Sequence, residues 1–155
     1  MSHEQRLAEL GITLPEVAAP VAAYVPAVQT GRYVYTSGQL PFVDGALPAT
    51  GKVGEGDGLV SPDDAAAYAR TCALNALAAV RSLTGSLDAV ARVVKVVGFV
   101  ASDPAFTGQP GVINGASTLL GEVFGDAGIH ARSAVGVAVL PLDAPVEVEL
   151  VVELA

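Results

Sequence analysis

The fold of this chain is decided by its C-terminal stretch, residues 130–155, which reads HARSAVGVAVLPLDAPVEVELVVELA. Two alternating runs, separated by Leu140-Pro141-Leu142-Asp143, predict strands at about 132–139 and 146–153. One charged residue, Arg132, enters the otherwise uncharged apolar first run. A guanidinium keeps its charge in a protein, so placing it in a core-like strand is costly unless an anion meets it. That anion could be a structural partner or the carboxylate of a ligand.

Glu147, in the second run, is the first candidate for that anion. It follows Arg132 by 15 residues through a short connection, a spacing compatible with antiparallel neighbouring strands. In that arrangement the two side chains would form a buried ion pair, and the residues taken alone favour this structural interpretation. The spacing is not specific for catalysis.

The rest of the chain reads as alternating strands and helices. Ser61-Pro62-Asp63-Asp64 is a strong helix start, and Gly85 is a typical helix end. The other expected elements are a strand pair at 24–29 and 32–36 with a turn at Thr30-Gly31, a central strand at 93–100, and a second helix at 112–124. We expect an α+β sandwich of the order β-β-α-β-α-β, with two helices on one face of a mixed sheet.

Two segments are expected to lie outside these layers. Residues 41–60 are rich in glycine and turn residues and predict an irregular, flexible surface loop. The loop cannot be a phosphate loop, because Val53 follows the lysine where that motif needs Ser or Thr. A short amphipathic piece from Glu4 to Leu10, ended by Gly11, belongs to an N-terminal extension (1–20) before a single domain (21–155).

Composition limits the functional classes. The chain has 155 residues, 52% of them hydrophobic and 15% charged, which suits one domain that hides apolar surface in a homo-oligomer. A net charge of −8 opposes nucleic-acid binding. No apolar run is long enough to span a membrane, and no secretory signal is recognisable. The single cysteine, Cys72, fits a reducing compartment, so we expect a cytoplasmic protein.

Isolated residues with reactive or polar side chains mostly have structural interpretations. Cys72 is expected to be buried and inert, and His3 to lie in a frayed tail. His130 is expected in a solvent-exposed loop. Lys95, in the central strand, could extend to a strand edge or another subunit, but pairing with a carboxylate is favoured. Asn114 is expected to open the second helix and hydrogen-bond its first turn, with a ligand contact as the alternative. No group of residues has metal-ligand spacing, so we expect no metal and no cofactor.

Three segments resemble the RidA/YjgF family, in the right order and spacing over about residues 20–155. They are YVPAVQTGRYVYTSGQLP (24–41), VINGA (112–116), and ARSAVGVAVLP (131–141) followed by VEVE (146–149). The resemblance implies a chorismate-mutase-like (YjgF-type) fold. It also implies a homotrimer with three clefts between subunits.

The resemblance also implies an activity. Active members hydrolyse reactive 2-imino or enamine acids to 2-oxo acids and ammonia. Arg132 matches the arginine that holds the substrate carboxylate, and Glu147 matches the glutamate that helps to position the attacking water. The other matching positions are Tyr24, Ser37, Gly38 and Asn114. A guanidinium fork binds a carboxylate bidentately, so this role explains a charge in an apolar strand.

The chain departs from the family pattern at Ala134, where well-studied deaminating members have cysteine. The backbone carbonyl there can still bind water, but a mechanism that uses the thiol is excluded. The 41–60 loop and the N-terminus are also longer than in short members. Three functions stay open: an imine deaminase, a non-catalytic regulatory trimer that binds a small carboxylate, and an endoribonuclease. The acidic composition and the lack of a histidine pair argue against the last.

Overall fold

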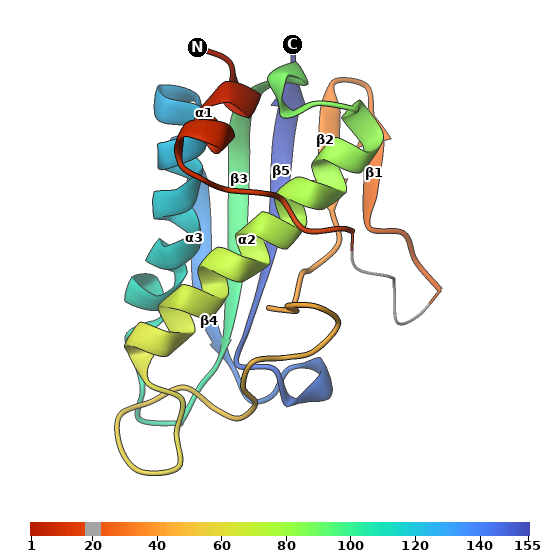
Figure 1. Ribbon diagram of the computed structural model, residues 1–155. Coiled ribbons are helices and arrows are strands. Elements are labelled where there is room, and N and C mark those ends of the chain that lie inside the picture. The colour runs from red at the N-terminus through yellow and green to blue at the C-terminus, as the bar shows by residue number, and fades with distance from the viewer. Residues whose placement is uncertain (18–22) are drawn as a thin grey trace.

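The computed structural model describes residues 1–17 and 23–155, which form three helices packed on a five-stranded mixed sheet (Figure 1). The helices are α1 (His3–Glu9), α2 (Pro62–Thr84) and α3 (Gln109–Phe124), and the strands are β1 (Ala27–Thr30), β2 (Tyr33–Thr36), β3 (Val90–Ala101), β4 (Ala131–Val137) and β5 (Val146–Leu154). Short 3-10 turns occupy Leu87–Ala89, Gly125–Gly128 and Pro141–Asp143. The predicted α+β fold is confirmed, although the predicted order counts one strand too few.

The sheet order β1-β2-β5-β3-β4 corrects one expectation. β4 and β5 are not neighbours, because β3 lies between them. β3 pairs in parallel with β4 and antiparallel with β5. Parallel strands need a long crossover, and α3 supplies it, so β3, α3 and β4 form one βαβ unit. The chain then returns through Pro141–Asp143 to the other side of β3.

Local end signals fix the two long helices. The Ser61 hydroxyl accepts a hydrogen bond from the Asp64 N–H, and Gly85 takes the left-handed conformation (φ 79°) at the end of α2, as predicted. α3 begins at Gln109, before the predicted residue 112, because Pro110 suits the first turn of a helix. Asn114 therefore lies inside α3, and the expectation that it opens the helix is wrong.

The core lies between the helices and one face of the sheet. One face of α2 consists mostly of small residues and is buried, and its members are Ala65, Ala69, Cys72, Ala76 and Ala79. Leu83, at the end of this face, is 45% exposed. Two glycines allow close packing. A methyl group at Gly98 in β3 would overlap Ile113 of α3, and one at Gly115 in α3 would overlap the carbonyl of Ala66 in α2. α3 is thus held close to both neighbours.

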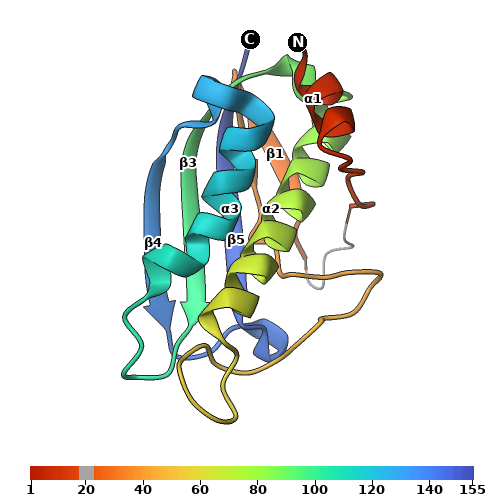
Figure 2. The ribbon, with the colours of Figure 1, turned by 60° about the vertical axis from the view of Figure 1, so that its left-hand side comes forward.

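The opposite face of the sheet carries no helix of the described chain, since all three helices lie on one side (Figure 2). Tyr33, Tyr35 and Val135 on this open face are more than a third exposed, and Phe99 is half-buried. No helix among residues 1–17 and 23–155 combines the length and apolarity that crossing a membrane demands.

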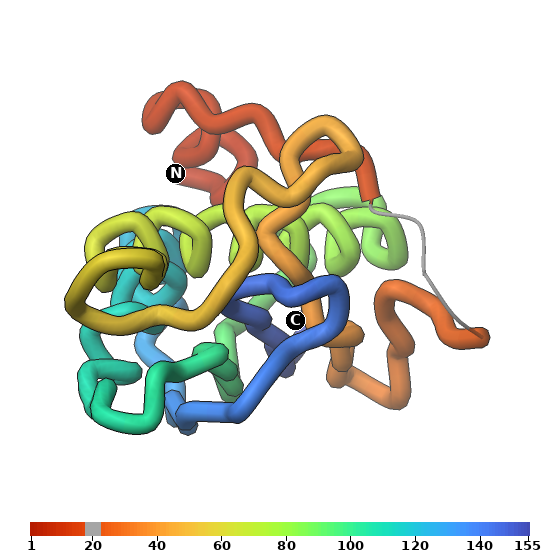
Figure 3. Tube along the Cα trace, turned by 90° about the horizontal axis from the view of Figure 1, so that it is seen from below, coloured from red at the N-terminus to blue at the C-terminus, as the bar shows by residue number. Residues whose placement is uncertain are grey.

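The 41–60 loop is irregular, as predicted, but it is not a free surface loop. It lies at the lower end of the molecule in Figure 1, the end from which Figure 3 is seen. Val53 is fully buried. Its N–H donates to the Ala101 carbonyl (2.7 Å), and its own carbonyl accepts from the Asp103 N–H (2.9 Å). These bonds tie the loop to the end of β3, so the prediction of flexibility is wrong at this point.

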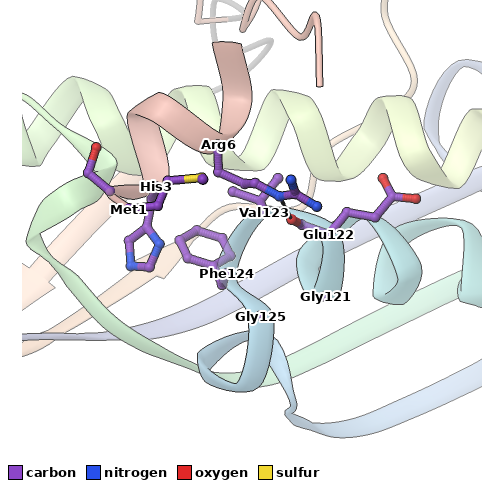
Figure 4. A pocket seen from close by; sticks show the side chains of 9 residues that line it. Met1, His3, Arg6, Gly121, Glu122, Val123, Phe124 and Gly125 are labelled. Atoms are coloured by element: carbon purple, nitrogen blue, oxygen red, sulfur yellow. Dashed lines mark hydrogen bonds between the residues drawn. The ribbon is translucent and has the colours of Figure 1, made fainter. Parts of the chain in front are cut away.

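The N-terminal helix is docked rather than frayed. His3 stacks edge-on against Phe124 (ring centroids 4.7 Å apart), and its Nε2 lies 3.1 Å from the Val90 carbonyl oxygen. Arg6 reaches from α1 to the end of α3, where its Nε donates to the Glu122 carbonyl at 2.9 Å (Figure 4). The expectation for His3 is therefore wrong. The proposed boundary between extension and domain falls within residues 18–22, outside the described residues.

Candidate functional site

Arg132 lies in β4, an edge strand, and its side chain turns toward α3. Its Nη1 donates to Asn114 Oδ1 at 2.7 Å and to Ser117 Oγ at 3.3 Å, while its Nη2 donates to the Pro110 carbonyl at 3.3 Å. Asn114 and Ser117 are three residues apart, so they share one face of the helix. Three neutral acceptors of α3 thus fix the guanidinium.

No carboxylate of residues 1–17 and 23–155 forms an ion pair with this guanidinium. Residues 1–17 and 23–155 contain four ion pairs, and none of them includes Arg132. A guanidinium has five N–H donors. Within the described chain, one on Nε and one on Nη2 have no acceptor. These two nitrogens form one edge of the fork, the edge on which a carboxylate can bind through two parallel hydrogen bonds. The arrangement can therefore receive an anion.

The expected ion pair with Glu147 is wrong. In the sheet register, Arg132 is level with Val96, whereas Glu147 is level with Phe99 on the far side of β3. Two strand spacings and three residues of offset separate their Cα atoms by ~14 Å. Their side chains also leave opposite faces of the sheet. The strand of Arg132 is not core-like either, since neighbouring Val135 is 43% exposed.

Glu147 forms the second part of the candidate site. Its neighbours Val146 and Val148 are buried under the helices, so Glu147 faces the open side of the sheet. A methyl group at Gly38 would overlap Glu147 Oε1, so the glycine leaves room for this carboxylate against the end of β2. Partial burial, and then the negative charge of Glu149, raise the pKa of the Glu147 carboxyl above its usual value.

Three further candidate residues lie near the two parts of the site formed by Arg132 and by Glu147. The Ser37 hydroxyl, beside Gly38, donates to the Val25 carbonyl, and Tyr24 precedes that residue with 45% of its surface exposed. Ala134 is level with Gly98 and packs partly against the core. The structure therefore brings Arg132 together with Asn114. It groups the segment containing Tyr24, Ser37 and Gly38 with Glu147.

Ser117, which was not a predicted site residue, contacts Arg132, and the expectation of a solvent-exposed His130 is wrong. His130 is half-buried instead of solvent-exposed, with Nε2 2.9 Å from Ser117 Oγ and Nδ1 2.6 Å from the Gly128 carbonyl oxygen. The signal that could have revealed Ser117 is its spacing of three residues from Asn114 on an expected helix.

Two other expectations can be checked. Cys72 is fully buried, as predicted, and burial followed by the charge of Glu147 raises the pKa of its thiol well above the usual value. Lys95 is half-buried, and no described carboxylate forms an ion pair with it, so its predicted pairing is wrong. In the part of the chain that the structure describes, no three His, Cys, Asp or Glu side chains gather to hold a metal ion.

Comparison with known proteins places this chain in a family. A family model described as "YjgF/chorismate mutase-like, putative endoribonuclease" matches residues 4–154. The chain belongs to the YjgF/chorismate mutase-like family. Protein TCP17 of Trypanosoma cruzi, another YjgF-family protein, is 47% identical over 149 residues, which cover 96% of this chain and 91% of TCP17.

Solved YjgF-type structures agree with the fold. A protein of Shewanella oneidensis, described as a "putative endoribonuclease", is 34% identical and superposes with a TM-score of 0.93, covering 99% of this chain and all of its own. Escherichia coli TdcF, solved with bound serine, is 26% identical with a TM-score of 0.65, over 92% of this chain and 96% of its own. Membership in the YjgF family confirms the resemblance and the fold.

Proposed function

We propose that this YjgF-family protein hydrolyses 2-imino or enamine acids to 2-oxo acids and ammonia, in clefts between the subunits of a cytoplasmic homotrimer. The observation that carries the proposal is the guanidinium of Arg132. It is fixed by neutral acceptors, lacks a carboxylate partner among the described residues, and keeps N–H groups on Nε and Nη2 for a ligand.

The chemistry of the fork favours a small carboxylate. A guanidinium edge matches the two oxygens of a carboxylate, and a charge-assisted pair fixes the orientation of the molecule that carries it. The bound serine of TdcF is an amino acid and so carries such a group. A 2-imino acid has its reactive C=N carbon next to the carboxylate, so one anchored end positions the reacting bond.

Glu147 is suited to the hydrolysis itself. A carboxyl with a raised pKa is a stronger base than an ordinary glutamate and can accept a proton from water. Water then adds to the imine carbon, and protons pass to the imine nitrogen. The C–N bond breaks, ammonia departs, and the carbon keeps the oxygen of water as a C=O group. With Ala134 at the position of the cysteine, the step relies on the carboxylate rather than on a thiol.

Two protomers are needed to combine these groups. Within one chain Arg132 and Glu147 leave opposite faces of the sheet, ~14 Å apart at their Cα atoms. The open face carries exposed tyrosine and valine side chains, a surface that a second copy of the chain could cover. We therefore propose that Arg132 of one protomer meets Glu147 of a neighbouring protomer.

The test is a deamination assay on freshly generated 2-iminopropionate and 2-iminobutyrate, following release of the 2-oxo acid. We expect wild type to exceed the rate in buffer, and Arg132→Ala to lose about 10- to 150-fold in kcat/KM, the range for a hydrogen bond to a charged group. Arg81→Ala, which removes an arginine paired with Glu4 on α1, is the matched control and should keep its activity. No acceleration over buffer with either imine would refute the deaminase.

Ala134 favours a second candidate, a regulatory trimer that binds a small carboxylate without turnover. In that case 2-oxobutyrate would raise the melting temperature of wild type but not of Arg132→Ala, and neither protein would release ammonia. An endoribonuclease is disfavoured, because a net charge of −8 opposes binding of a polyanion.

A further inference from the structure

Beside Arg132 lies a line of hydrogen bonds that the proposed reaction does not use. It runs from Arg132 Nη1 to Ser117 Oγ (3.3 Å), from there to His130 Nε2 (2.9 Å), and from His130 Nδ1 to the Gly128 carbonyl oxygen (2.6 Å). It links the strand that carries Arg132 with the helix that supplies its acceptors. Of its two inner members, Ser117 is already one of the acceptors that fix the guanidinium, whereas His130 has no part in the chemistry described above.

The partners determine the direction of each bond. A carbonyl oxygen only accepts, so His130 Nδ1 must carry the hydrogen at the Gly128 end. In the neutral ring Nε2 is then an acceptor, and the Ser117 hydroxyl must donate to it. That leaves the lone pairs of Ser117 Oγ for the N–H of Arg132. Every donor in the line therefore has an acceptor, and all point from Arg132 toward Gly128.

The backbone around Gly128 is built for this contact. A methyl group at Gly128 would overlap the Leu120 carbonyl of α3, so only glycine lets the turn before β4 lie this close to the helix. The buried Gly128 carbonyl is thereby held where His130 meets it. His130 precedes Arg132 by two residues and turns, like it, toward α3, as the contacts of both with Ser117 require.

We propose that Ser117 and His130 are positioning residues for Arg132, which together hold Nη1 so that Nε and Nη2 face the ligand. The inference rests on the proposed function, in which Arg132 binds the ligand carboxylate. Neither residue touches the substrate. They orient the guanidinium of Arg132. They therefore affect the affinity for the carboxylate and not the rate of the hydrolysis step.

Variants separate this role from a structural one. Ser117→Ala removes the oxygen, and His130→Asn keeps an amide donor for Gly128 but loses the acceptor for Ser117. Each should weaken 2-oxobutyrate binding in calorimetry, and raise KM at constant kcat, about 3- to 10-fold, as expected for one neutral hydrogen bond. His130→Gln, whose amide oxygen can replace Nε2, should restore affinity. The double variant should bind no more weakly than Ser117→Ala alone, because both changes break one line.

Additive losses in the double variant, or equal losses in His130→Gln and His130→Asn, would overturn the inference while leaving the deaminase proposal standing. A second measurement needs neither ligand nor variant. Long-range ¹⁵N–¹H spectra of wild type at pH 7.5 should show the His130 hydrogen on Nδ1 and an unprotonated Nε2. A hydrogen on Nε2 would overturn the inference. Binding of 2-oxobutyrate without any deamination would refute the deaminase and still allow the calorimetric test.

Discussion

A methyl group added at Gly115 should separate α2 from α3, whereas one added at Gly121 should only strengthen α3. At Gly115 the new Cβ would overlap the backbone carbonyl of Ala66, but at Gly121, in the same helix, it would meet nothing within 4 Å. Replacing glycine by alanine inside a helix gains about 1 kcal/mol. Gly121→Ala should show this gain. At Gly115 overpacking costs about 1–3 kcal/mol, and the upper end applies because a backbone atom cannot rotate away.

The two variants should therefore shift the free energy of unfolding in opposite directions. We expect Gly115→Ala to lose about 2 kcal/mol net and Gly121→Ala to gain about 1 kcal/mol. For a chain of this length, that corresponds to a melting temperature lowered by about 4–8 °C and raised by about 2–4 °C. Urea and thermal unfolding at one fixed protein concentration measure both values. Stabilisation by both variants alike would refute the close contact of α2 and α3.

The remaining predictions concern three residues. In Gly38→Ala the obstacle is the mobile end of the Glu147 side chain, so turnover should fall sharply while stability changes by less than about 1 kcal/mol; a large loss of stability in urea would contradict this. Because the pKa of Glu147 is raised by folding, wild type loses stability as pH rises from the unfolded pKa through the folded one. Glu147→Gln should therefore be the more stable protein at pH 7, with the difference vanishing in acid, and melting curves across this range check the sign. The pKa of Asp88 is lowered, first by the backbone N–H of Glu4. Its contribution is present above the unfolded pKa and lost as pH falls through the folded one, so Asp88→Asn should reduce the acid dependence of unfolding; an unchanged profile would contradict it.

The elements that sequence predicted best are those whose signals are local. Ser61 and Gly85 mark the ends of α2 because a capping hydroxyl and a left-handed glycine act within a few residues of the backbone they satisfy. By contrast, which strands pair with each other depends on residues far apart in the sequence. Alternation in residues 132–139 and 146–153 predicts two strands equally well whether they pair with each other or, as here, on either side of β3.

The candidate site likewise contains residues that the sequence could predict and residues that it could not. Family resemblance identified Arg132 and Asn114 from their segments, and the structure brings them together at 2.7 Å. The part played by Ser117 and His130 depends on the register of β4 on β3, in which Ala131 lies level with Lys95. No pattern within either segment specifies that register, so the contact between helix and strand could only be found in three dimensions.

The position of β3 between β4 and β5 changes the interpretation of Arg132, which has no carboxylate partner among the described residues. β4 is an edge strand with an exposed valine, Val135, and a charge on such an edge opposes pairing with another sheet. Lysine would serve that purpose equally well, since it needs only to carry a charge into water. It could not use the oxygens of Asn114, Ser117 and Pro110 as a guanidinium does. The guanidinium is planar, so these acceptors can bind N–H groups of Nη1 and Nη2 while one N–H on Nε and one on Nη2 stay available. Three acceptors arranged around a planar fork suit the proposed carboxylate site better than the need for a charged edge.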